Sequence, residues 1–463
     1  MKRTWLFFAL VSTALLAACG TSSTHFTPPP PPPVIKVAIT PTTTTSVINQ
    51  SVQFSATVTG TTNKAVTWTV KESAAGTVKE GLYQAPVVNG TYHVVATSVA
   101  DPTKSASAEV AVSAPFLFIQ QADSVAGKPF SVTPVLGTFG ADTKFTLTNI
   151  NDSSTGKPIV DAIEDIFLSA DGTKAVFTLV SIMTNPDSST YWVENIYVAD
   201  VATGTITQLT DNTKQGQYFW RPQFTPDGKQ IVYLYYDWAN STTCDSEIWM
   251  MNADGSNQHV VYASCTADEP WSDHPSVSPD GSKIVAEVDR YVGESWYDGI
   301  AIMNIDGTNI VQLTGGSNET CANGGHYYWD ENPSFSADGK QIFFARHCDL
   351  PELGCTLSIY KINVDGTGLQ ALVNADTKVY NTDPLVVGDK VVFSSDRDTP
   401  RTGAFDIYSM KADGSGITRL TNNMLFDAFT SYYLPESAAK VAQSRSQKRA
   451  GQTGSGVRAH HKH

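Results

Sequence analysis

The sequence lacks the signatures that identify most membrane-spanning proteins and several common enzyme classes. The apolar run Trp5–Leu15 is too short to cross a bilayer comfortably. Helical periodicity is almost absent. No Gly-x-Ser-x-Gly elbow occurs in the repeat region described below, and no glycine-rich phosphate loop precedes a helix. These absences argue against a serine hydrolase of the elbow type and against a nucleotide-phosphate site.

Basic residues are also scarce in most of the chain. Residues 115–435 carry 18 Lys and Arg against 40 Asp and Glu, a net charge of −22 within a chain total of −14. Binding to phosphates needs a basic face, so we expect no nucleic-acid partner. The acidity remains compatible with cationic partners. No cofactor is predicted.

The sequence contains a repeat in place of those signatures. An apolar strand followed by an Asp-Gly turn recurs every 50 to 58 residues or so, a period typical of propeller blades. The copies are Phe167–Gly172, Phe224–Gly228, Val277–Gly281, Phe335–Gly339 and the divergent Leu385–Lys390. A second strand in each unit usually ends in another Asp-Gly turn, and a Leu-Thr strand closes most units. Asp-Gly between apolar runs predicts a hairpin, and four strands repeated radially predict a β-propeller.

The two ends of the repeat region predict one further blade. Asp427–Pro435 matches the inner strand that opens a unit, but the unit stops there. At the other end, Phe116–Gln120, Phe130–Pro134 and Thr143–Asn149 read as three strands without an inner partner. Together they complete a sixth blade, which removes an exposed strand edge.

The repeat resembles the TolB-type, or WD-like, propeller repeat, and residues 222–233 are close to that family's pattern. The resemblance covers about two-thirds of the chain. It implies an all-β fold with a six-bladed β-propeller over residues 115–435. It also implies a role in protein–protein interactions in the periplasm. The motif consists of turn formers and core strand residues, so it says little about ligands.

The N-terminus predicts export and lipidation. A basic start and an apolar stretch lead to Leu16–Cys19, which resembles a bacterial lipobox. We expect a signal peptide over residues 1–18 and acylation of Cys19, with Gly20 favouring the outer membrane; a plain signal peptide or a membrane anchor is the alternative. Residues 19–33 form a proline-rich tether, in which Pro28–Pro33 favours polyproline II.

Residues 34–114 predict a separate small β domain. About seven short alternating strands, with Trp68 in the core, suggest an immunoglobulin-like (Ig-like) β-sandwich. Gly81–Pro86 resembles the bacterial Ig-like group. Such modules serve as spacers and sometimes as adhesins. The last segment, residues 436–463, is basic and aperiodic, which predicts a disordered tail.

Five of the six cysteines lie in loops on one predicted face of the propeller. No Cys-x-x-Cys pair is present, which disfavours zinc, and an exported protein favours disulfides. We predict Cys244–Cys265 and Cys348–Cys355, with Cys321–Cys348 as the main competitor. The sequence does not determine the connectivity.

The same face is the candidate binding surface, because the residues that enter each inner strand lie at the mouth of the central channel. Aromatic rings with interleaved carboxylates there suit a protein segment or a sugar; plugging the channel is the structural alternative. The candidate binding residues are Trp220, Arg221, Trp271, Asp273, His274, Trp329, Glu331 and Asp383. His274, His326 and His347 are weak metal candidates without a compact ligand spacing, so no metal is predicted.

The predicted function is therefore that of a lipid-anchored envelope protein, facing the periplasm or the cell surface. Its propeller would act as a non-catalytic scaffold for an envelope protein partner. The alternatives are a carbohydrate-binding module and a metal-dependent polysaccharide lyase-like enzyme. No catalytic residue is predicted.

Overall fold

The computed structural model describes residues 33–48, 50–73, 75–86, 90–114, 116–122, 131–137, 143–144, 163–237, 246–263, 271–292, 295–315, 326–350, 354–373, 379–398, 405–422 and 426–428. All regular structure in these ranges is β-strand, which confirms the all-β prediction. Within the same ranges, no helix has the length and hydropathy needed to cross a membrane. The predicted signal peptide, the tether with Cys19 and the basic tail lie outside the described residues.

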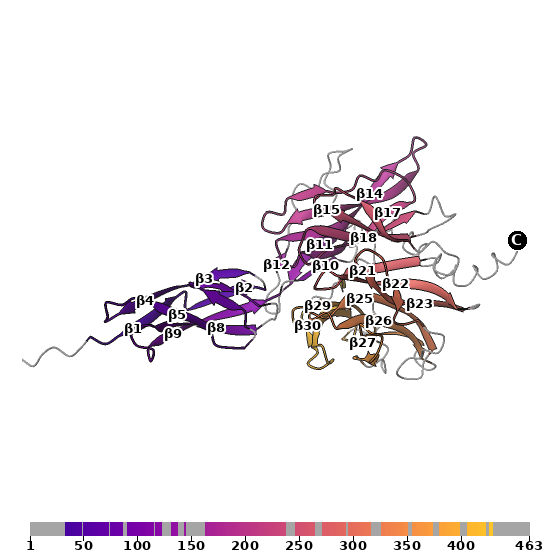
Figure 1. Cartoon of the computed structure of the whole chain (residues 1–463). Helices are drawn as coiled ribbons and strands as arrows, with labels where there is room; N and C mark the ends of the chain where they lie inside the picture. The colour runs from indigo at the N-terminus through magenta and orange to yellow at the C-terminus, as the bar shows by residue number, and fades with distance from the viewer. Residues whose placement is uncertain are drawn as a thin grey trace, which may run out of the picture.

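An elongated N-terminal lobe is built from the first nine strands (Figure 1). Its largest sheet has the order β2-β9-β8-β5, in which β2 and β9 run parallel. Two small sheets, β1-β4 and β3-β7-β6, complete the lobe. The strands are β1 (Lys36–Thr40), β2 (Thr43–Val47), β3 (Ser51–Gln53), β4 (Ser55–Thr59), β5 (Val66–Val70), β6 (Thr77–Lys79), β7 (Leu82–Gln84), β8 (Gly90–Ser98) and β9 (Ser105–Ser113).

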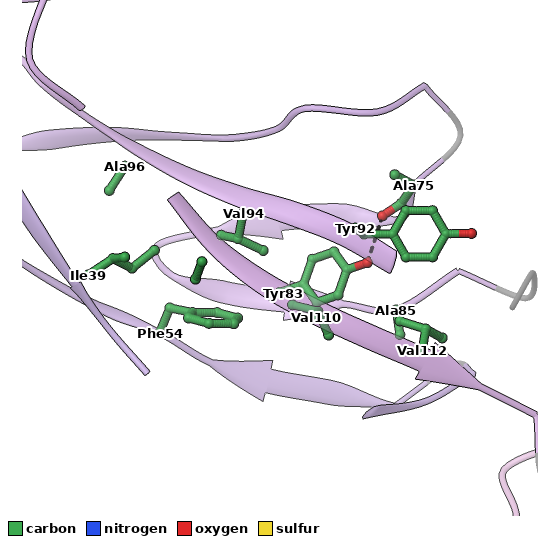
Figure 2. Close-up of a cluster of buried hydrophobic side chains, with 11 residues drawn as sticks. Ile39, Phe54, Ala75, Tyr83, Ala85, Tyr92, Val94, Ala96, Val110 and Val112 are labelled. Atoms are coloured by element: carbon green, nitrogen blue, oxygen red, sulfur yellow. Dashed lines mark hydrogen bonds between the residues drawn. The ribbon is translucent and has the colours of Figure 1, made fainter. Parts of the chain in front are cut away.

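Alternating residues of these strands form one hydrophobic core (Figure 2). Phe54, Tyr83, Val94 and Val110 are almost fully buried. The hydroxyl of Tyr83 donates a hydrogen bond to the carbonyl of Ala75 at 2.8 Å, so this buried polar atom is satisfied. The predicted core residue Trp68 is half-buried and packs against the edge of this core.

The remaining strands form four-stranded antiparallel units that follow the sequence repeat. The unit orders are β13-β14-β15-β16, β17-β18-β19-β20, β21-β22-β23-β24, β25-β26-β27-β28 and β29-β30-β31-β32; a single parallel bridge, Asp298 to Trp329, joins the third and fourth. Their bounds are β13 (Ile163–Leu168), β14 (Lys174–Thr184), β15 (Thr190–Asp200), β16 (Ile206–Gln208), β17 (Gln217–Phe224), β18 (Gln230–Asp237), β19 (Ser246–Asn252), β20 (His259–Ala263), β21 (Trp271–Val277), β22 (Lys283–Val292), β23 (Ser295–Asn304), β24 (Val311–Gln312), β25 (His326–Phe335), β26 (Gln341–Leu350), β27 (Gly354–Asn363), β28 (Gln370–Ala371), β29 (Asn381–Val387), β30 (Lys390–Ser395), β31 (Asp406–Lys411) and β32 (Thr418–Arg419).

The sixth unit combines strands from both ends of the repeat region. Its order is β12-β11-β10-β33, made of β10 (Phe116–Ala122), β11 (Ser131–Gly137), β12 (Thr143–Lys144) and β33 (Phe426–Ala428). β33 pairs antiparallel with β10, with Gln120 opposite Asp427. The contribution from both chain ends is as predicted, although the pairing begins one residue before Asp427 and most of Asp427–Pro435 lies outside the described residues.

The first strands of neighbouring units contact one another in sequence order. β13 contacts β17, β17 contacts β21, β21 contacts β25, and β25 contacts β29. The sixth unit touches both neighbours, because β33 contacts β30 and β31 while β10 contacts β13. This succession of four-stranded sheets is a β-propeller-type arrangement.

The Asp-Gly turns are stabilised by their own side chains. Asp227 accepts hydrogen bonds from the Thr225 hydroxyl at 2.7 Å and from the Lys229 amide at 3.1 Å. Gly228 adopts φ 68°, a conformation that favours glycine. At the equivalent turn, hydrogen bonds from Ser278 and Ser282 lower the pKa of Asp280 to about 2. The repeated motif is thus a device for closing hairpins.

The two lobes meet through a small apolar cluster. Ile48 and Ala114, at the end of the N-terminal lobe, pack with Phe116 of β10 and with residues of β29, β30 and β31. The side chain of Gln50 also donates a hydrogen bond to the carbonyl of Asp171, in the first Asp-Gly turn, at 3.0 Å. The N-terminal lobe therefore rests on the side of the sheets that carries these turns, opposite the predicted binding face.

Candidate functional site

Five of the inner strands share one backbone irregularity. In each, a β-bulge interrupts the pairing with the next strand, and the first residue of the bulge has a positive φ. These residues are Asp165 (50°), Arg221 (52°), His274 (50°), Asn332 (55°) and Asp383 (53°). Each lies six residues before the aspartate of the following turn, so the irregularity is part of the repeat.

None of the five residues is glycine, although left-handed backbone is costly for other residues. Proline follows four of them, and a proline is tolerated in a strand at a bulge because no ladder hydrogen bond is lost there. Strained backbone that recurs at one place is a reason to look for function there. Here it places a buried polar side chain on each of five inner strands.

Arg221 connects two acidic residues of neighbouring units. Its guanidinium lies 2.8 Å from Asp165 and 3.7 Å from Asp273. Burial raises the pKa of Asp165 above its ordinary value, and the attraction of Arg221 opposes that rise only in part. Both carboxylates are nearly inaccessible to solvent, so this is a buried charge cluster rather than a surface ion pair.

His274 is held by a carboxylate from the strand behind it. Nδ1 of His274 lies 2.9 Å from Glu287 of β22 and 3.4 Å from Asp273. Burial and the nearby Arg221 guanidinium lower the pKa of His274, but Asp273 and Glu287 outweigh them and raise it overall. Nε2, the ring nitrogen that does not contact Glu287, is buried and makes no hydrogen bond within the described part of the chain.

The remaining two residues of the series are paired with each other. The Asn332 amide donates a hydrogen bond to Asp383 at 2.8 Å. Arg221, His274, Asn332 and Asp383 also line one small pocket, which the five successive inner strands β13, β17, β21, β25 and β29 share. The pocket volume of about 40 Å³ is enough for a few water molecules or a small polar group.

A second cluster lies nearer the start of β25, where the predicted mouth begins. The rings of Trp329 and His347 are 4.0 Å apart, and His347 Nε2 lies 3.2 Å from Glu331. Thr382 of the next unit contacts Glu331 at 3.5 Å. Trp329 is half-buried, so part of its ring is available for contact.

β17 carries an aromatic cluster of its own. Trp220 stacks on Tyr236 with ring centroids 6.3 Å apart, and Tyr218 lies 6.1 Å from Tyr236. Both Trp220 and Tyr218 are half-buried. The cluster therefore presents ring surface at the start of an inner strand, next to Arg221.

The structure thus brings together Arg221, Asp273, His274 and Asp383. It places Trp220 and Trp329 in the first halves of inner strands, and Glu331 just past the middle of β25. Trp271 and His326 begin strands, but their side chains lie outside what the structure describes. Among the described residues, no group of three or more His, Cys, Asp and Glu is arranged to hold a metal ion.

Sequence reasoning missed Glu287 and Arg346. Both lie on second strands, directly opposite acidic residues of the inner strands: Glu287 faces Asp273 and Arg346 faces Asp330. Each directly follows a run of apolar residues, Ile284–Ala286 or Ile342–Ala345, and neither is solvent-exposed. A charged residue after an apolar run in a strand could have been recognised in the sequence as a buried charge that needs a partner.

The backbone conformation at Asn332 makes a specific prediction. We expect Asn332→Val to unfold at lower denaturant concentration than Asn332→Gly, by about 1–3 kcal/mol in the free energy of unfolding. Both variants lose the hydrogen bond to Asp383. The difference between their free energies of unfolding therefore reports the cost of the positive φ. Urea unfolding followed by circular dichroism measures it. Equal stability of the two variants would contradict a strained bulge.

Cys348 is disulfide-bonded and buried. In the β26–β27 hairpin, Cys348 faces Thr356 and Cys355 faces Asp349. In this register Cys355 is one residue away from the position directly opposite Cys348, and the side chain of Cys355 lies outside what the structure describes. A disulfide needs its two Cβ atoms about 3.5–4.5 Å apart, a separation typical of directly opposite residues, so we favour the competing pair Cys321–Cys348 over Cys348–Cys355.

We therefore expect Cys348 to pair with Cys321, the competing partner. Cys244, Cys265 and Cys321 lie outside the described residues. Peptide mapping by mass spectrometry without reduction should recover a peptide that links Cys321 to Cys348. Recovery of a Cys348–Cys355 loop peptide would show that the register argument is wrong.

Comparison with known proteins gives distant similarities. No family model matches the chain. An uncharacterized protein of Agrobacterium fabrum, Atu1656, is 28% identical over 162 residues; these cover 34% of this chain and 48% of Atu1656, so the chain matches about half of that relative's length.

The solved structures that resemble this chain share little sequence identity with it. A "putative TolB" from Agrobacterium tumefaciens has a TM-score of 0.42 and 17% identity, covering 68% of this chain and 91% of that one. Oligogalacturonate lyase from Vibrio parahaemolyticus has a TM-score of 0.37 and 13% identity, covering 58% and 70%. A puromycin-hydrolyzing peptidase of Mycobacterium tuberculosis has a TM-score of 0.42 and 12% identity, covering 75% and 53%.

Proposed function

We propose that this chain is a lipid-anchored protein of the bacterial envelope whose propeller binds a protein partner. In this proposal, Cys19 carries the lipid and residues 19–33 are a tether. The N-terminal lobe is an Ig-like spacer, and residues 115–435 form a closed, TolB-like six-bladed propeller. Binding takes place on the face where the inner strands begin.

The observation that carries the proposal is the repeated bulge of the inner strands. Five units each place a polar residue at the same strained position, and nothing in hairpin formation requires this. Partly exposed aromatic rings, Trp220 and Trp329, lie at the start of the same strands. Aromatic residues surrounded by satisfied polar groups are typical of binding hot spots. The joint with the N-terminal lobe is on the opposite side.

The experiment is capture of partners by cross-linking in intact envelopes, with the wild-type chain and Trp329→Ala. We expect Trp329→Ala to weaken capture by about 1–3 kcal/mol, a loss of roughly 5- to 150-fold in affinity, because a partly exposed ring at a hot spot contributes that much. The melting temperature should change little.

The matched control is Leu369→Ala, which removes an exposed apolar side chain beside the turn at Asp365. It should leave capture unchanged. A large fall in melting temperature for Trp329→Ala with unchanged capture would show that the ring is a structural plug, and the proposed binding face would be wrong.

Carbohydrate capture is the second candidate, favoured by the Tyr218, Trp220 and Tyr236 rings. Sugar rings stack on such surfaces. Incubation with envelope polysaccharides distinguishes the candidates. Retention of glycan without a protein cross-link favours the carbohydrate module, and release of shortened, unsaturated glycan favours the lyase-like alternative.

A further inference from the structure

The pocket between the inner strands has two chemically different halves. On one side lie the guanidinium of Arg221 and the imidazole of His274. On the other lies Asp383, with the Asn332 amide bonded to it. The four residues come from four successive units, which places Arg221 and Asp383 at opposite ends of the series.

The charges behind the pocket reinforce this division. Asp165 and Asp273 contact Arg221, and Glu287 contacts Nδ1 of His274. None of these three carboxylates lines the pocket. They hold the guanidinium and the imidazole in place from behind, while the charged or titratable groups that line the pocket are one guanidinium, one imidazole and one carboxylate.

One polar atom at this site has no partner among the described residues. Nδ1 of His274 lies beside Glu287 on β22, so Nε2 points away from that carboxylate, and His274 itself lines the pocket. His274 is 8% exposed, and its Nε2 makes no hydrogen bond to any residue that the structure describes. A buried polar atom without a partner costs free energy, which a bound acceptor would recover.

We propose that this pocket binds a small zwitterion of the α-amino acid class. Arg221 and Nε2 of His274 hold the carboxylate, and Asp383 accepts hydrogen bonds from the ammonium group. The pocket is large enough for this polar head group but not for a folded segment, so the ligand's side chain extends toward the mouth near Trp220 and Trp329. This site is separate from the proposed protein partner, and either can fail without the other.

The test uses the full chain and calorimetric titration with glycine, alanine and the other natural amino acids. Acetate and methylammonium serve as probes for the two halves of the site. We expect saturable binding of at least one amino acid, at least about 10-fold tighter than either half-probe, because only the zwitterion satisfies both halves. Absence of binding for all amino acids would overturn the proposal.

Two variants test which residues form the site. Both introduce asparagine, because asparagine tolerates a positive φ. Arg221→Asn and Asp383→Asn should each lower the affinity for the bound amino acid by about 10-fold or more. Asp383→Asn should leave acetate binding unchanged, and Arg221→Asn should leave methylammonium binding unchanged. The charge-matched controls, Lys229→Asn and Asp211→Asn, lie on exposed turns and loops and should bind as wild type.

Further results would support or reject the zwitterion site. If a variant fails to fold, as judged by circular dichroism, His274→Asn takes its place and should lose carboxylate binding. Equal affinity for acetate and for the amino acid would reject the zwitterion in favour of a simple anion site. Binding of Mn²⁺ or Zn²⁺ alone, abolished in His274→Asn, would reject it in favour of a metal.

Discussion

Replacing Asp330 with alanine should destabilise the protein by about 3–5 kcal/mol. Asp330 and Arg346 form a bidentate pair with two contacts of 2.7 Å, and neither side chain is exposed to solvent. The guanidinium also lies over the rings of Phe344 and Tyr360. Without Asp330 the charge of Arg346 stays buried and loses its bidentate partner. Chemical unfolding of the two proteins measures the difference.

A double variant gives the matched control. Asp330→Leu with Arg346→Met removes both charges and should recover most of the loss, because a buried pair contributes little net stability over apolar packing. Lys229→Ala breaks an exposed pair with Asp227 and should cost less than about 1 kcal/mol. Asp330→Ala with wild-type stability would show that the pair is not buried as described.

Ending the chain at Asn422 should lower the melting temperature by about 10 °C or more. This truncation removes β33, which pairs with β10 and contacts β30 and β31. β10 then becomes an exposed edge, and the contact between the first and last units is lost. For the roughly 320 residues of the repeat region, a shift of about 10 °C corresponds to a loss of about 7 kcal/mol in the free energy of unfolding. Calorimetry of both chains provides the measurement.

The control ends the chain at Pro435 and removes only the basic tail, residues 436–463. We expect this chain to melt as the full-length protein does. If the chain that ends at Asn422 also melts unchanged, closure by the two chain ends contributes nothing to stability. An equal loss in both truncated chains would place the stabilising contact in the tail instead.

The sequence by itself determined the units of this protein. Asp-Gly turns and alternating apolar strands act locally, since Asp227 bonds to residues two positions away on either side. Strand number and strand order within a unit could therefore be predicted. The completion of the sixth unit from both ends of the repeat region could also be predicted. The three strands at the start of this region had no inner strand to pair with, and one inner strand was left over at its end.

Tertiary structure decided the chemistry of the inner strands. Asp330 meets Arg346, and Asp273 meets Glu287, only because each strand pairs in one register. The bulges at Arg221, His274 and Asp383 shift that register by inserting residues, and turn motifs do not show where a strand is interrupted. The pocket depends on side chains from successive units, about 50 residues apart. Such neighbours are set by the packing of whole sheets, which no local pattern specifies.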